Sequence, residues 1–211
     1  MNIQQITDLL KDGNVLERLM AVRAAAQTQE QELVSLLLSH LQKEKSPGVR
    51  RAVAEALGKL GDPRAVPALI EVLKHDNKKV RRAAAEALGI IGSREAVPAL
   101  IQALGINRGW RDAGVPEAAA EALGKLGAPE AVPALVEALR EETLSIQIAA
   151  AKALGAIAAP EAVRPLIEAY WESGRLLRET YRLSLKSIFL RLLLPLGKET
   201  AKAVEDIFFG F

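Results

Sequence analysis

The chain has 211 residues, of which 50% are hydrophobic and 4% aromatic, a formal net charge of +2 and no cysteine. The lack of cysteine excludes disulfides, thiolate catalysis and cysteine-ligated zinc, and the dominance of alanine and leucine favours helices over a sheet. The N-terminus lacks a basic-then-apolar pattern and the apolar runs are too short to span a bilayer, so we expect a cytoplasmic protein without membrane insertion.

The first 45 residues predict three helices, at 3–10, 15–25 and 32–42. None of them carries the motif that recurs further along the chain. Terminal units of a repeat protein often depart from the consensus because one of their faces meets water. We therefore interpret 1–45 as an N-terminal cap.

A motif occurs four times between residues 46 and 170. "AEALGKLG" at 54–61 recurs as "AEALGIIG" at 85–92, "AEALGKLG" at 120–127 and "AKALGAIA" at 151–158, and each copy precedes a segment like "DPRAVPAL" at 62–69. A fixed period with matched apolar positions indicates one supersecondary unit per repeat.

Each repeat predicts two helices. The first begins after an N-cap such as Asp62 and contains Pro67, which we expect to remove one hydrogen bond and bend the helix. The second is expected to end at Gly89 and Gly92, which suit a left-handed C-cap. One helical pair cannot bury its apolar face alone, so neighbouring pairs should stack.

The C-terminal residues 171–211 predict a second cap, made of a long helix at 175–194 that stops at Pro195 and a last helix at 198–208. With both caps around the regular repeats 46–170, we expect a single domain over 1–211. Its predicted class is all-α, an α-solenoid of about five stacked helical hairpins with ten or eleven helices.

The repeats resemble the HEAT family, and specifically its short repeats of the phycobilisome-lyase type, through "VRRAAAEALG" at 80–89 and "AVPAL" at 65–69. The resemblance implies a buried ladder of aspartate and arginine six residues apart, a spacing that Asp76 and Arg82 match. The later equivalents of Arg82 are Glu117 and Ile148, so the chain departs from the family pattern in its C-terminal half.

The segment "GINRGWRDAGVP" at 105–116 interrupts the period with a four-residue insertion between two helices. A tryptophan beside arginines is typical of an interface hot spot, which makes a partner-binding set of Arg108, Trp110, Arg111 and Asp112. Alternatively, Trp110 folds back over the edge of the repeats and the glycines only permit the turn.

A second candidate site is basic. Residues 43–82 carry eleven basic and five acidic side chains, whereas residues 83–172 carry seven and twelve. Stacking should align the basic residues of successive repeats into one patch for an acidic partner or phosphates. Alternatively, Arg51–Glu55 and Arg82–Glu86 pair along one helix face, or part of the set belongs to the ladder. The candidate residues are Arg50, Arg51, Lys78, Lys79, Arg81 and Arg82.

Catalytic motifs are absent from the sequence. The only histidines are His40 and His75, and neither forms the His-Glu pair with which deoxyhypusine hydroxylase, a HEAT-like enzyme, holds iron. No nucleophile elbow, phosphate-binding glycine loop or metal-spaced set occurs. We therefore expect no enzymatic activity, no cofactor and no metal.

The leading hypothesis is a protein–protein interaction scaffold or adaptor whose partner is another protein, with the chain itself a monomer or weak homodimer. The resemblance implies an alternative, a bilin-handling protein such as a phycobilin lyase subunit or a phycobilisome-degradation adaptor. A HEAT-like DNA glycosylase is a further alternative that Trp110 and Asp112 suggest. The acidic stretch after residue 83 argues against a nucleic-acid partner.

Overall fold

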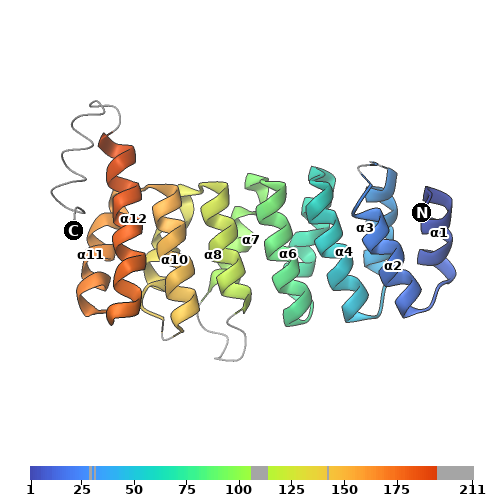
Figure 1. The fold of residues 1–211 in the computed structure, drawn as a ribbon, viewed down its shortest axis with the longest axis horizontal. Helices are drawn as coiled ribbons and strands as arrows, with labels where there is room; N and C mark the ends of the chain where they lie inside the picture. Colours follow the sequence, from blue (N-terminus) through green and yellow to red (C-terminus); the bar gives the residue numbers. More distant parts are fainter. Residues whose placement is uncertain (29, 31, 106–113, 142, 194–211) are drawn as a thin grey trace. The chain divides into compact units, whose positions relative to one another are not determined.

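The structure is a computed structural model that describes residues 1–28, 30, 32–105, 114–141 and 143–193. Within these residues it contains twelve α-helices, four short 3₁₀ helices and no strand. The chain divides into two compact units, Met1–Ala103 and Leu104–Phe211, which are described separately (Figure 1). No helix in the described part is long and apolar enough to cross a membrane.

The first unit is a stack of helical hairpins in two layers (Figure 1). Helices α2, α4 and α6 pack side by side in one layer, while α3 packs on α4 and α5 on α6. The predicted helices at 3–10, 15–25 and 32–42 are confirmed as α1 to α3. The elements are α1 (Ile3–Asp12), α2 (Val15–Ala25), α3 (Glu32–Lys43), α4 (Pro47–Leu60), η1 (Pro63–Ala65), α5 (Val66–His75), α6 (Lys78–Ile91), η2 (Arg94–Ala96) and α7 (Val97–Leu104).

We call the helices that pack side by side, such as α2, α4 and α6, the inner helices, and those that pack on them, such as α3 and α5, the outer helices. The start of each outer helix shows how the repeat motif folds. The Asp62 carboxylate accepts a hydrogen bond of 2.8 Å from the Arg64 backbone N–H and so caps the 3₁₀ turn η1. Helix α5 begins only at Val66, so Pro67 lies in its first turn, where the missing N–H leaves no hydrogen bond unmade. The expectation that Pro67 removes a hydrogen bond from the helix was therefore wrong, and a bend at Pro67 stays a prediction.

The end of each inner helix needs a left-handed residue. Gly61 and Gly92 adopt φ values of 68° and 79° as the C-caps of α4 and α6, as predicted for Gly92. Gly89 does not end a helix, contrary to prediction, because it is buried inside α6. In the second unit Ala158 takes the same left-handed conformation at φ 59°.

Glycines inside the inner helices allow close packing between repeats. A Cβ atom on Gly58 of α4 would lie 2.8 Å from both Cα and Cβ of Ala87 on α6. Gly124 has the same relation to Ala153 in the second unit, at 2.8 and 3.0 Å. Glycine is needed at these positions because the neighbouring helix is too close for a side chain, and not because the chain turns there.

The second unit repeats the arrangement of the first. Helices α8, α10 and α12 pack side by side, α9 packs on α10, and α11 on α12. Helix α12 matches the predicted 175–194 helix, whereas the helix predicted at 198–208 lies outside the described residues. The elements are α8 (Gly114–Leu126), η3 (Pro129–Ala131), α9 (Val132–Ala138), α10 (Leu144–Ile157), η4 (Pro160–Ala162), α11 (Val163–Glu172) and α12 (Arg175–Leu193).

Both units are thus stacked hairpins, and the predicted α-solenoid class is confirmed. The described residues hold twelve α-helices rather than the predicted ten or eleven, and each repeat has both of its predicted helices, including α7 and the seven-residue α9. That one domain covers 1–211 stays a prediction.

Candidate functional site

The loop candidates cannot be placed. Arg108, Trp110, Arg111 and Asp112 lie outside the described residues, so their contact role stays a prediction. The six residues of the basic set all lie in the first unit, on α4 and α6. The structure separates them into two groups with different surroundings.

Arg50 belongs to the first group, whose side chains enter the stack. Its Nε donates to Asp76 Oδ2 at 2.6 Å, and its Nη2 forms an ion pair with the same oxygen. Its Nη1 donates to the backbone oxygens of Leu41 and Glu44 at 3.1 and 3.2 Å. With 24% of its side chain exposed, Arg50 joins the end of one outer helix to the loop after the next.

Arg81 and Arg18 occupy the same place in their own repeats. Arg81 Nε donates to the Leu73 backbone oxygen at 2.9 Å. Arg18 donates from Nη1 to Gly13 O at 2.7 Å and from Nε to Glu44 Oε2 at 2.8 Å. Each is the fourth residue of its helix. We call Arg18, Arg50 and Arg81 the arginine ladder.

The predicted pairing of Asp76 with Arg82 is wrong. Asp76 binds Arg50 from the preceding repeat, whereas Arg82 Nε donates to Glu86 at 2.8 Å on the helix surface. Adjacent residues in a helix point about 100° apart. Arg81 therefore faces the stack, and Arg82 faces outward.

Glu44 is the buried acid at the first ladder position, with 3% of its side chain exposed. Burial alone would raise the pKa of Glu44, but the hydrogen bonds from the Arg18 guanidinium and the Ser46 backbone N–H outweigh it and hold the pKa below its usual value. Burial lowers the pKa of His40, whose Nε2 lies 3.0 Å from Glu44 Oε2 without hydrogen-bonding geometry. The cluster of Arg18, Glu44 and His40 therefore stabilises the fold at neutral pH, where Glu44 is charged.

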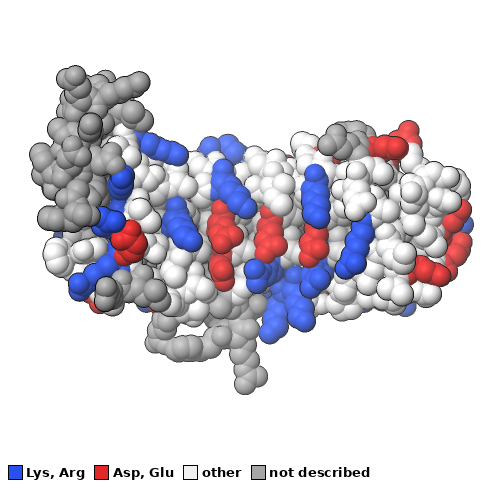
Figure 2. Space-filling model, in the orientation of Figure 1, with Lys and Arg blue, Asp and Glu red and all other residues white. Residues whose placement is uncertain are grey.

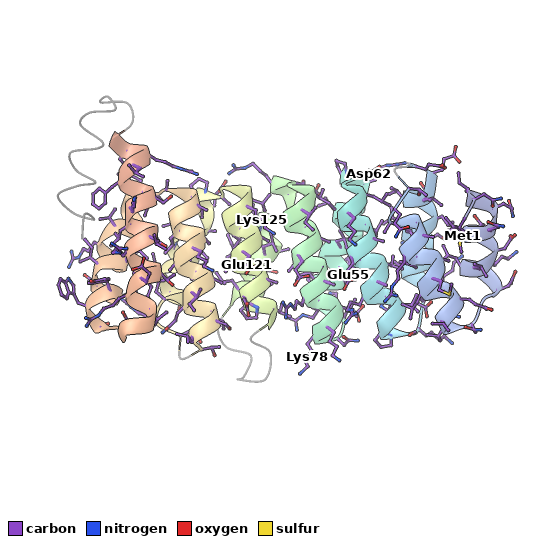
Figure 3. The ribbon with its side chains drawn as sticks, viewed as in Figure 1. Met1, Glu55, Asp62, Lys78, Glu121 and Lys125 are labelled. Atoms are coloured by element: carbon purple, nitrogen blue, oxygen red, sulfur yellow. The ribbon has the colours of Figure 1, made fainter. Side chains whose placement is uncertain are left out.

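The second group forms an exposed surface at the N-terminal half of α4 and α6. The predicted pairs Arg51–Glu55 and Arg82–Glu86 are confirmed, at 3.1 and 2.8 Å. Figure 2 shows basic side chains gathered at this end of α6, and Figure 3 places Lys78 there. We call Arg51, Lys78, Lys79 and Arg82 the basic surface; all four residues are exposed.

The ladder changes in the second unit. The fourth residue of α10 is Gln147, whose Nε2 donates to the Glu141 backbone oxygen at 2.5 Å. The fourth residue of α12 is again an arginine, Arg178, which donates to Ser173 O at 3.3 Å and lies 5.7 Å from the centre of the Tyr170 ring. The fourth residue of α8 is Glu117, so two of the three ladder positions of this unit lack an arginine, and the one on α10 holds a shorter, uncharged side chain.

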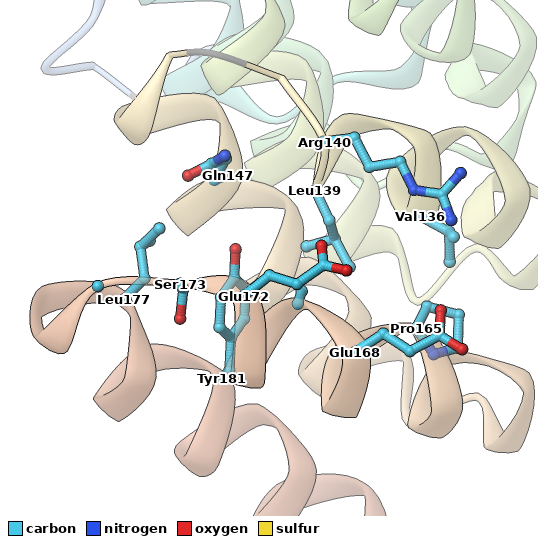
Figure 4. Close-up of a pocket in the computed structure, with 12 residues that line it drawn as sticks. Val136, Leu139, Arg140, Gln147, Pro165, Glu168, Glu172, Ser173, Leu177 and Tyr181 are labelled. Carbon is cyan, nitrogen blue, oxygen red and sulfur yellow. The ribbon is translucent and has the colours of Figure 1, made fainter.

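A cavity of about 610 Å³ lies beside Gln147 (Figure 4). It is enclosed by the end of α9, the exposed side of α11 and the start of α12, and we call it the Gln147 pocket. Its polar lining includes Arg140, Glu168, Glu172 and Tyr181, and its apolar lining includes Leu139 and Leu177. Sequence reasoning missed this pocket; the available signal was the glutamine in an arginine position.

Metal chemistry finds no support in the described residues, where no three His, Asp or Glu side chains are grouped to hold an ion. Another hollow, of about 520 Å³, lies in the first unit beside Arg18, His40 and Glu44. These three residues are those of the first ladder position, so the hollow adds no further group of side chains to that site.

Comparisons with known proteins agree with this architecture. The sequence matches the family described as HEAT repeats over residues 3–78, 61–113 and 111–186. A search of curated protein sequences gave no significant match.

Among solved structures, the complex of CpcE and CpcF of phycocyanin lyase from Nostoc sp. PCC7120 is similar, with a TM-score of 0.67 and 28% identity over 92% of this chain and 80% of that one. An engineered protein gives a TM-score of 0.61 with 22% identity over 89% and 99% of the two chains. A computationally designed armadillo repeat protein for modular peptide recognition gives 0.56 with 17% identity over 88% and 99%. The last two support the fold alone.

Proposed function

Because this chain belongs to the HEAT repeat family, we propose that it is a non-catalytic scaffold that binds another protein through the surface of its repeats. Stacked helical repeats offer extended surfaces of aligned side chains. The observation that carries the proposal is the basic surface on α4 and α6. It lies in the segment 43–82, where basic side chains outnumber acidic ones eleven to five.

The ion pairs on this surface do not oppose binding. Arg51 and Arg82 are about half exposed, and so are Glu55 and Glu86. Exposed pairs of this kind contribute about 0–1 kcal/mol, so a partner carboxylate can replace the internal one at little cost. Complementary charge also accelerates association and selects against basic partners. The proposed partner is thus a protein with an acidic surface.

Quantitative capture from the source lysate tests the proposal. A Lys78→Glu/Lys79→Glu/Arg82→Glu variant should recover the wild-type partner at least about tenfold less well. A matched variant with Lys11, Lys125 and Lys152 changed to glutamate alters the net charge equally on exposed residues outside the segment 43–82 and should retain it. Equal loss in both variants would contradict the assigned surface. Trp110→Ala in the same assay tests the loop hypothesis.

A bilin-handling role is the second candidate. The observation that favours it is the 28% identity to the phycocyanin lyase structure over 92% of this chain. Phycocyanobilin added to the purified chain should then show a shifted visible absorption band. An unchanged spectrum at micromolar protein would remove this candidate and leave the scaffold proposal standing.

A further inference from the structure

We propose that the Gln147 pocket binds the guanidinium group of an arginine supplied by a protein partner. The proposal deepens the scaffold function and rests on it, because it names the chemistry of a partner segment. The partner's arginine would occupy the position that Arg18, Arg50 and Arg81 fill in the first unit. Four observations on the second unit lead to this assignment.

A carboxylate lies beside the ladder position where the arginine is lost. Arg18 and Arg50 bind Glu44 and Asp76, which lie 26 residues further along the chain and directly after α3 and α5. The corresponding residue for Gln147 is Ser173, directly after α11. Its neighbour Glu172, the last residue of α11, is exposed and lines the pocket.

Gln147 can supply an acceptor to the pocket. One N–H of its Nε2 donates to Glu141 O, and its Oε1 can accept a hydrogen bond. Its side chain is also shorter than arginine and carries no charge. The space that Arg50 fills in the first unit is therefore open beside Gln147.

Tyr181 provides a second acceptor from a different helix. Its side chain lies on α12 with 1% of the residue exposed, and its hydroxyl points into the pocket (Figure 4). The Tyr181 oxygen is not among the fully buried unpaired atoms of the described residues, so a ligand group in the pocket can reach it and donate a hydrogen bond to it.

The acceptors suit a planar fork of donors. Glu172, Gln147 and Tyr181 come from α11, α10 and α12 and border one cavity (Figure 4). A guanidinium has five N–H donors in fixed directions and can bond several acceptors at once, whereas an ammonium is a compact point charge.

The remaining lining fits the rest of an arginine residue. Leu139 and Leu177 line the cavity and provide apolar contact for the methylene stem of arginine. The one cation of the lining, Arg140, is exposed. Two carboxylates also line the cavity: Glu172, and Glu168, which pairs with the exposed Arg164 at 2.8 Å. At about 610 Å³ the pocket also admits residues that flank the arginine.

Titration calorimetry with a synthetic peptide tests the proposal. The probe is acetyl-Ala-Leu-Arg-Leu-Ala-amide, and its control replaces arginine with citrulline, which has the same shape without the charge. We expect the arginine peptide to bind the full chain at least about tenfold more tightly. Equal affinity for both peptides, or no binding of either, would overturn the proposal.

Three substitutions locate the binding in the pocket. Gln147→Arg should place an internal guanidinium in the cavity beside Glu172, raise the Tm and weaken peptide binding at least about tenfold, because the site is then filled. Tyr181→Phe and Glu172→Gln should leave the helical signal unchanged and weaken binding several-fold. Peptide binding that is unaltered in all three variants would place the site elsewhere and refute the assignment.

One further variant separates this proposal from the scaffold proposal. Lys78→Glu/Lys79→Glu/Arg82→Glu changes the first unit only and should bind the peptide like the wild type. If the peptide fails to bind while partner capture by the wild type persists, the pocket assignment falls and the scaffold function stands. If capture fails while the arginine peptide binds through the pocket, the basic surface is the part that is wrong.

Discussion

Gly58→Ala should separate two helices that now touch. The new Cβ would lie 2.8 Å from Cα and Cβ of Ala87, and ordinary contacts begin at 3.4 Å. Neither atom belongs to a flexible side chain, so α4 and α6 must move apart. Overpacking of this kind costs about 1–3 kcal/mol, and the contact with a backbone atom places Gly58→Ala at the upper end.

Alanine is also a better helix former than glycine, by about 1 kcal/mol. The net loss is therefore about 2 kcal/mol, which corresponds to a Tm lower by about 4–8 °C in a chain of this length. Thermal and urea unfolding followed by circular dichroism measure both quantities. A lower urea midpoint with an unchanged slope would indicate lost stability rather than a changed unfolded state.

Gly48→Ala is the matched control in the same helix. Its Cβ would meet only the Ser46 Oγ, at 3.8 Å, in an exposed position. The helix-propensity gain is then unopposed, so the variant should be more stable than wild type by about 0.5–1 kcal/mol. If Gly58→Ala proves as stable as Gly48→Ala, the close approach of α4 and α6 does not limit the side chain at residue 58.

Three other predictions concern the ladder, a helix end and pH. Arg50→Gln should destabilise the protein by about 1–3 kcal/mol in urea unfolding, because Asp76 and two backbone oxygens lose a charged donor; Arg51→Gln, which removes only an exposed pair, should change stability by less than about 1 kcal/mol. Ala158→Gly should raise stability by about 1 kcal/mol, because Ala158 adopts a left-handed φ of 59°; a loss would contradict this reading of the helix end. Burial holds the pKa of His40 below its usual value. The contribution of neutral His40 to the free energy of unfolding is therefore fully present above its pKa in the unfolded chain, about 6.5, and is lost as the pH falls through its pKa in the folded protein. His40→Gln should flatten the decline in unfolding free energy between pH 7 and 5, and an unchanged decline would exclude His40 as its source.

The helices were predictable because they depend on local patterns. The Gly92 C-cap and the Asp62 N-cap follow from residues close together in the chain, and the four copies of the motif give the same signal. Gly89 was misread because a glycine near a helix end has two explanations. Only the neighbouring helix, which the local pattern does not contain, decides between a cap and a close contact.

The candidate site was less predictable because its contacts span repeats. Arg50 and Asp76 are 26 residues apart, and a shift of one residue, from Arg81 to Arg82, exchanges the interior for the surface. The pocket beside Gln147 exists because the glutamine side chain is too short to fill the space that an arginine fills at the equivalent positions. Only the structure shows this space, because it lies between helices that are far apart in the sequence.

The glycine contacts have a consequence for the length of the chain. Gly58, Gly124 and Gly155 each meet a residue 29 positions further along, Ala87, Ala153 and Ser184. A second copy of residues 62–92, inserted after the first, would place Gly89 of the original 29 positions before Ala87 of the duplicate. The inserted unit would thus arrive with the small residues that its neighbours require. We expect the protein to be extensible by whole repeats, whereas one residue added between Gly58 and Ala87 would lengthen their spacing of 29 positions by one and put that contact out of register.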